Sequence, residues 1–175
     1  LMGTAGDVAI YGNMAMANRR GKPRGVRWKV TAQEKEDFKS QLARLGLGLE
    51  DRLTAKVGLL SGGQRQALTL LMASLQRPEL LLLDEHTAAL DPLTARKVLE
   101  LTEEIVQEEH LTTLMITHNM NDAIRIGNRL IMMYDGKIIL DVRDEEKQKL
   151  TVEALHQKFR EAANEEFSDD RAVLI

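Results

Sequence analysis

Four consecutive leucines, Leu80 to Leu83, constrain the fold more than any other feature of the sequence. The run begins shortly after Pro78 and ends at the acidic pair Asp84-Glu85. A short, continuous apolar run of this kind predicts a strand that is buried on both of its faces, as in a parallel sheet. The chain is therefore expected to contain an α/β core.

A second apolar run, residues 111–117, closes at His118 and predicts another buried strand. Between the two runs, Asp91-Pro92 has the residues of a helix start, with Asp as the cap and Pro at the first helical position. Apolar residues at helical spacing then continue to about Glu109, and we expect Leu93, Val98, Leu101, Ile105 and Val106 to face the core. Strand–helix–strand order predicts parallel strands, whose chemistry lies at their carboxyl ends.

The remaining elements are predicted to be mostly helical before this core and mixed after it. The expected order is a helix near 10–17, a basic connector at 18–30, a capped helix at 31–45, a helical turn at 49–53, a short helix at 121–126, a hairpin at 129–140 with an Asp-Gly turn, and a last amphipathic helix. We therefore divide the chain into an α-helical subdomain (1–76), the α/β part (77–165) and a loose acidic tail (166–175).

The stretch Leu60-Ser61-Gly62-Gly63-Gln64 predicts the start of a further helix. Ser61 and Gln64 have the spacing of a capping box, which satisfies backbone amides at a helix start. Two glycines in the first turn each cost about 1 kcal/mol relative to alanine. One interpretation is a bare backbone that meets an anion at the positive end of the helix. The other is an ordinary capped helix.

The acidic pair and the histidine at the strand ends allow two interpretations each. Asp84 could help to hold Mg²⁺ while Glu85 orients or deprotonates a water molecule. Alternatively, the strand leaves the core through two solvated acids. His118 could donate a hydrogen bond to a phosphate oxygen, or it could be structural.

Composition excludes several classes of protein. The chain has 175 residues and no cysteine, which rules out disulfides and cysteine-ligated zinc. A net charge of −3 gives no global attraction to nucleic acid. The apolar runs are far too short to span a bilayer, and no signal peptide is recognisable at the start of the sequence. We find no Ser/His/Asp arrangement, so covalent catalysis is not expected.

Taken together, the motifs resemble those of the ATP-binding cassette (ABC) ATPase family. Residues 60–64 resemble the signature motif, residues 80–85 resemble Walker B with the catalytic glutamate, residues 89–91 resemble the D-loop, and His118 resembles the H-loop histidine. The stretches 46–91 and 130–140 look most like bacterial importer ATPases of the tryptophan/tyrosine type or uncharacterised ones. The resemblance implies a P-loop NTPase-like fold, with a partial parallel sheet flanked by helices.

The resemblance also implies a role for each motif residue. Ser61, Gly62 and Gly63 would touch the γ-phosphate of ATP bound to a second ATPase subunit, in a head-to-tail dimer, and Gln64 and Asp91 would also belong to the nucleotide-binding residues. Asp84 would help to hold Mg²⁺, Glu85 would polarise the attacking water, and His118 would contact the γ-phosphate. Asp91 would join the two sites across the dimer.

The implied partners are the second ATPase subunit, transmembrane permease subunits and, indirectly, an extracytoplasmic substrate-binding protein. No nucleic acid is expected. The resemblance implies that the protein lies on the cytoplasmic face of the membrane, where ATP hydrolysis would drive transport of a small solute. The direction of transport that it implies is import.

Two departures from the family pattern stand out. The sequence has no Gly-x-x-x-x-Gly-Lys-Ser/Thr phosphate loop, nor the Q-loop glutamine or the adenine-stacking aromatic, so it resembles the C-terminal two-thirds of a cassette and is expected to be inactive alone. His86 stands where the family usually has proline, which could alter the loop after Glu85. Two other functions stay open: a soluble ABC ATPase of translation or DNA repair, and a non-catalytic dimerisation or regulatory module.

Overall fold

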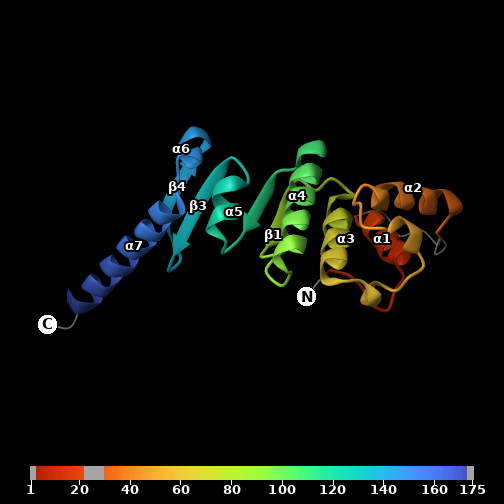
Figure 1. Ribbon diagram of the computed structural model, residues 1–175, viewed down its shortest axis with the longest axis horizontal. Coiled ribbons are helices and arrows are strands. Elements are labelled where there is room, and N and C mark those ends of the chain that lie inside the picture. Colours follow the sequence, from red (N-terminus) through yellow and green to blue (C-terminus); the bar gives the residue numbers. More distant parts are fainter. Residues whose placement is uncertain (1–2, 22–29, 173–175) are drawn as a thin grey trace. The chain divides into compact units, whose positions relative to one another are not determined.

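The computed structural model describes residues 3–21 and 30–172, with side chains described as far as residue 163. The chain divides into two compact units, Leu1–Ile116 and Thr117–Ile175, each of which is described separately below (Figure 1). The boundaries expected at residues 76 and 165 divide the chain differently and stay a prediction. Most of the basic connector at 18–30 lies outside the described residues.

The first unit begins with the helical elements that the sequence predicts: α1 (Ile10–Asn18), α2 (Ala32–Ala43), the 3-10 turn η1 (Glu50–Arg52) and α3 (Gly62–Ser74). A second 3-10 turn, η2 (Val57–Leu59), was not predicted. Thr31 caps α2 in a reciprocal capping box with Glu34. After α2 the chain turns at Gly46 and Gly48, which have φ values of 60° and 66°. Only glycine adopts this left-handed conformation readily, so these residues end the helix as expected.

The α/β part of this unit contains β1 (Leu81–Asp84), α4 (Pro92–Glu108) and β2 (Thr113–Ile116). The two strands are parallel, with Leu81 opposite Thr113 and Asp84 opposite Ile116. This pairing confirms the parallel arrangement predicted from the strand–helix–strand order. Figure 1 shows α4 between β1 and α3.

The prediction that both strands are buried on both faces is wrong for the described residues. Leu81 and Leu83 belong to the same core cluster as side chains of α1, α2, α3 and α4. The opposite face of the sheet is open: Leu82 is 64% exposed, and Leu80, Leu114 and Ile116 are at least half exposed. The physical reason is that alternate side chains of a strand point to opposite faces, and the helices of the core cluster cover only one face of this sheet.

Leu93 is likewise not a core residue, since it is 67% exposed. It lies one turn before Lys97, which is also exposed, whereas Val98, Leu101 and Ile105 form the buried stripe of α4. Leu93 lies in the first turn of α4, before the buried stripe begins at Val98.

The second unit contains α5 (Met120–Arg125), β3 (Arg129–Tyr134), β4 (Lys137–Arg143), α6 (Asp144–Gln148) and α7 (Val152–Ala172). The strands β3 and β4 form the predicted antiparallel hairpin. Asp135 and Gly136 in its turn both have positive φ, 43° and 72°, as an Asp-Gly hairpin turn requires. Phe159 of α7 packs edge-to-face on Tyr134 at 5.0 Å between ring centroids.

The acidic tail is not loose as far as the structure describes it. Helix α7 continues to Ala172, so the described part of this segment is helical. Among the described residues, no helix is both long and apolar enough to cross a membrane.

Candidate nucleotide-contacting site

The start of α3 is closed by the predicted capping box. The Ser61 hydroxyl accepts a hydrogen bond from the Gln64 amide at 3.2 Å, and the Gln64 side-chain oxygen accepts one from the Ser61 amide at 3.2 Å. The Gln64 side-chain nitrogen also donates to the Leu47 carbonyl at 3.2 Å. Gln64 thus fixes the start of the helix to the loop before it. Ser61 itself is exposed and accessible to a ligand.

The two glycines of this turn differ in their surroundings. Gly62 is exposed, and a Cβ atom added there would lie 3.1 Å from the end of the Leu90 side chain. Gly63 is buried, and an added Cβ would lie 2.0 Å from Cγ2 of Thr94 in α4. No real Cβ contact is that short. Packing of α3 on α4 within this chain is therefore sufficient reason for glycine at position 63.

This packing reason was missed by sequence reasoning, which considered only an anion or a plain helix cap. Thr94 lies 31 positions further along the chain, and nothing in the local sequence pairs it with Gly63. The anion interpretation keeps its support at Ser61 and Gly62, which stay exposed.

Asp84 and Glu85 end β1, as predicted, and both are exposed. Asp84 is the last residue of the strand, opposite Ile116. The described residues contain no group of three or more acidic or histidine side chains that could hold a metal. Mg²⁺ often takes only one or two protein carboxylates, together with waters and phosphate oxygens. A single exposed carboxylate at Asp84 fits that limited contribution.

Glu85 adopts an uncommon backbone conformation, with a φ of 42°. Its amide donates to the Ile116 carbonyl at 3.0 Å, and its carbonyl accepts from the Ala88 amide at 3.0 Å. The glutamate therefore sits in a tight turn directly after the strand.

His86 is held from two sides. Its ring Nε2 lies 3.1 Å from the Thr102 hydroxyl in α4, and its carbonyl accepts a hydrogen bond from the Gln66 side chain in α3. Burial lowers the pKa of His86 below its ordinary value, which favours the neutral ring. Sequence reasoning identified the unusual residue but neither of its partners, because both contacts are tertiary.

Asp91 caps α4, as the sequence predicts. Its carboxylate accepts a hydrogen bond from the Thr94 amide at 3.1 Å. Hydrogen bonding with the Thr94 side chain and amide lowers the pKa of this exposed Asp91 carboxyl. The role expected for Asp91 between two subunits stays a prediction.

His118 is an exposed residue two positions beyond β2, at the start of the second unit. The fold thus places it after the strand, as expected. Its contact with a γ-phosphate stays a prediction.

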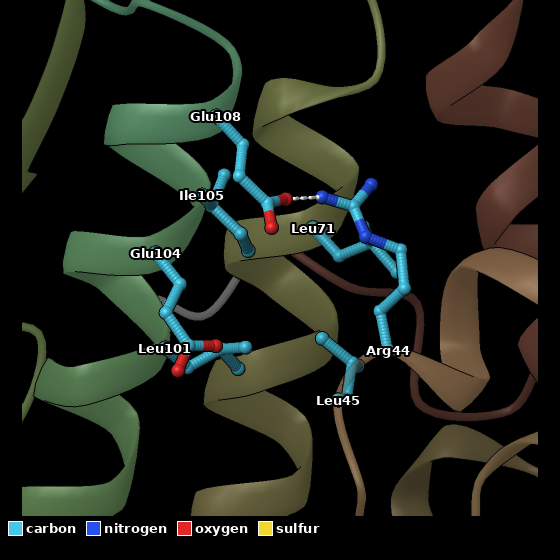
Figure 2. A pocket seen from close by; sticks show the side chains of 7 residues that line it. All are labelled: Arg44, Leu45, Leu71, Leu101, Glu104, Ile105 and Glu108. Carbon is cyan, nitrogen blue, oxygen red and sulfur yellow. Dashed lines mark hydrogen bonds and ion pairs between the residues drawn. The ribbon is translucent and has the colours of Figure 1, made fainter.

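A cleft of about 410 Å³ lies beside the signature residues. Its lining includes Ser61, Gly63 and Gln64 at the start of α3 and Lys97 and Glu100 of α4. A smaller hollow of about 210 Å³ lies next to it and contains none of the predicted site residues. Figure 2 shows this hollow with Leu71, Leu101 and Ile105 inside and the Arg44–Glu108 ion pair across its rim.

Comparison with known proteins gives consistent matches. The sequence profile described as "ABC transporter" matches residues 6–88. The chain is 45% identical, over 161 residues, to a tyrosine transport ATP-binding protein of Clostridioides difficile, covering 92% of this chain and 64% of that protein. It is 39% identical, over 131 residues, to a phosphate import ATP-binding protein of Gloeobacter violaceus, covering 75% of this chain and 47% of that protein. The chain thus spans about half to two thirds of the length of these relatives.

Solved structures agree in fold. A dimeric ATP-binding cassette in a post-hydrolysis state, bound to ADP and Pi, superposes with a TM-score of 0.65 at 25% identity, over 81% of this chain and 59% of that one. A metal-chelate type ABC transporter in an inward-facing conformation superposes with a TM-score of 0.71 at 24% identity, over 88% and 59% of the two chains, and shows the fold alone. The chain belongs to the ABC ATPase family, and its fold is that of a P-loop NTPase cassette.

Proposed function

We propose that the complete gene product is the ATP-hydrolysing subunit of an ABC importer for a small solute. The observation that carries this proposal is the exposed signature turn, Ser61-Gly62, in a chain whose β1 strand ends in the exposed carboxylates Asp84 and Glu85. The relatives above are named as transport or import ATP-binding proteins. Two copies would assemble head to tail, so that each signature turn faces the nucleotide of the other copy.

Each site residue has a proposed task in that dimer. ATP supplies the phosphoryl group that passes to water. Glu85 accepts a proton from the attacking water, and His118 donates a hydrogen bond to the γ-phosphate. Asp84 contributes one oxygen ligand to Mg²⁺. Ser61 and the backbone amides at Gly62 and Gly63 hold the γ-phosphate at the positive end of α3.

The partners follow from the same proposal. Permease subunits in the membrane would receive the motion of dimer closure, and the ATPase would lie on the cytoplasmic face of the membrane. An extracytoplasmic binding protein would deliver the solute.

The test uses the complete gene product with Glu85→Gln. Removal of a general base typically lowers turnover by about 10²–10⁴-fold. We expect that loss in kcat, with ATP binding retained and a dimer trapped by ATP in size-exclusion chromatography. Glu79→Gln is the matched control, because Glu79 is exposed just before β1 and has no proposed role. Wild-type turnover by the Glu85→Gln variant would contradict the proposal.

Purification from membranes tests the partners. Recovery of permease subunits with the ATPase supports a transporter. Recovery of RNA without a permease would favour the translation type, and absence of ATPase activity in the wild-type protein would favour a regulatory module.

A further inference from the structure

The backbone at Glu85 needs support from its surroundings. A side-chain-bearing residue with φ of 42° is in the left-handed region, where its Cβ crowds the following carbonyl. Such conformations persist only where neighbouring contacts over-determine them. The two backbone hydrogen bonds of Glu85 close this turn, and further support comes from the contacts of His86.

His86, the residue after Glu85, connects this turn to α4 through Thr102. Thr102 is 3% exposed, and its hydroxyl donates to the Val98 carbonyl at 2.7 Å. Because that hydroxyl has a single hydrogen, it can only accept from the His86 Nε2 atom, 3.1 Å away. His86 Nε2 therefore carries a hydrogen and donates it. Because Thr102 lies in the middle of the 17-residue helix α4, this hydrogen bond fixes the position of the His86 ring.

The main chain of the same residue is held by α3. The Gln66 side chain donates to the His86 carbonyl, and Gln66 lies in the same helix as the signature turn. The ring and the carbonyl of one residue are thus bonded to two different helices. Both contacts lie one residue beyond the carboxylate that would activate water.

We propose that His86 is a positioning residue for Glu85, and that its hydrogen bonds to Thr102 and Gln66 fix the turn that aims the glutamate carboxylate. This inference rests on the proposed role of Glu85. Through Gln66, the same contacts link the signature helix to the glutamate of its own chain. A small displacement of a reacting group can lower a rate by as much as about 10²-fold, so loss of either anchor acts on turnover.

The test compares variants of the complete gene product. Thr102→Val keeps the shape but removes the acceptor, and His86→Leu removes the donor. We expect each to lower kcat by about tenfold while KM for ATP changes less than about twofold. Thr102→Ser keeps the hydroxyl and is expected to retain turnover within about twofold.

The reductions in kcat caused by Thr102→Val and His86→Leu must also be coupled. If His86 and Thr102 act through one bond, the double variant has nearly the kcat of either single variant. The inference would be overturned if the kcat loss of the double variant equalled the product of the two single losses. It would also be overturned if Thr102→Val left kcat unchanged, or if either variant changed only KM.

A second readout does not depend on catalysis. The Ala88 amide bonds to the Glu85 carbonyl, so its hydrogen exchange reports the order of the turn. Exchange is expected to accelerate in Thr102→Val and His86→Leu but not in Thr102→Ser, and equal rates in all variants would overturn the inference. If Glu85→Gln retains turnover, the proposed function fails, and the exchange rates still decide whether His86 holds the turn.

Discussion

Gly63 gives the sharpest test of how the signature helix is built. Gly63→Ala would place a methyl carbon 2.0 Å from Thr94 Cγ2, whereas ordinary contact begins at 3.4 Å. The gap to be opened is therefore more than 1 Å, between two packed helices. Overpacking of this kind costs about 1–3 kcal/mol, and the better helix propensity of alanine returns up to about 1 kcal/mol. We expect a net loss of about 1–2 kcal/mol in the free energy of unfolding.

The measurement is denaturant unfolding followed by circular dichroism. Gly62→Ala is the matched control, because its Cβ would meet only the movable end of Leu90, at 3.1 Å. Its expected effect is within about 0.5 kcal/mol. Thr94→Ser removes the obstructing methyl group, and the remaining Thr94 Cβ would lie 3.5 Å away, an ordinary contact. The Gly63→Ala/Thr94→Ser protein should therefore regain the stability of Thr94→Ser alone.

Two results would refute this reasoning. One is a Gly63→Ala protein as stable as wild type, and the other is a loss of stability that Thr94→Ser does not relieve. The ATPase rate of the double variant adds a separate conclusion. If stability returns and turnover does not, Gly63 has a further task at the phosphate besides packing.

Three other predictions concern local structure. Asp91→Ala removes the cap of α4 and is expected to cost about 0.5–2 kcal/mol in denaturant unfolding, whereas Asp91→Ser should cost little. Hydrogen bonding with Thr31 lowers the pKa of Glu34, so the Glu34 carboxylate stabilises the fold above its ordinary pKa, and this stabilisation is lost as the pH falls through the lowered pKa. Glu34→Gln should therefore reduce the drop in Tm between about pH 5 and pH 3. An unchanged drop in Tm would contradict this. Gly136→Ala forces alanine to φ of 72° with no steric contact and should cost about 1–2 kcal/mol, while Gly136→Asn should cost less.

Local patterns were predicted well from the sequence because their causes are local. The capping boxes at Thr31 and Ser61, the Asp91 cap and the Asp-Gly hairpin turn each depend on residues within four positions of one another. The parallel pairing of β1 and β2 also followed, since chain order leaves few alternatives.

Tertiary relations were predicted poorly. The contact of Gly63 with Thr94, and that of His86 with Thr102, join residues whose separation in the chain carries no periodic signal. Burial was overestimated at Leu82 for a different reason: an apolar run indicates what a strand prefers, but not which neighbours cover it. Motif resemblance identified the family, whereas the task of each site residue still awaits the experiments above.

The open face of the β1–β2 sheet has a practical consequence for handling this protein. Leu80, Leu82, Leu114 and Ile116 present adjacent apolar side chains on a short sheet. Apolar surface of this kind on a sheet favours self-association. A protein made of these 175 residues is therefore expected to bind hydrophobic dyes and to precipitate at high concentration. Replacing Leu82 and Leu114 with threonine, which suits strands, should improve its solubility without disturbing the core behind Leu81 and Leu83.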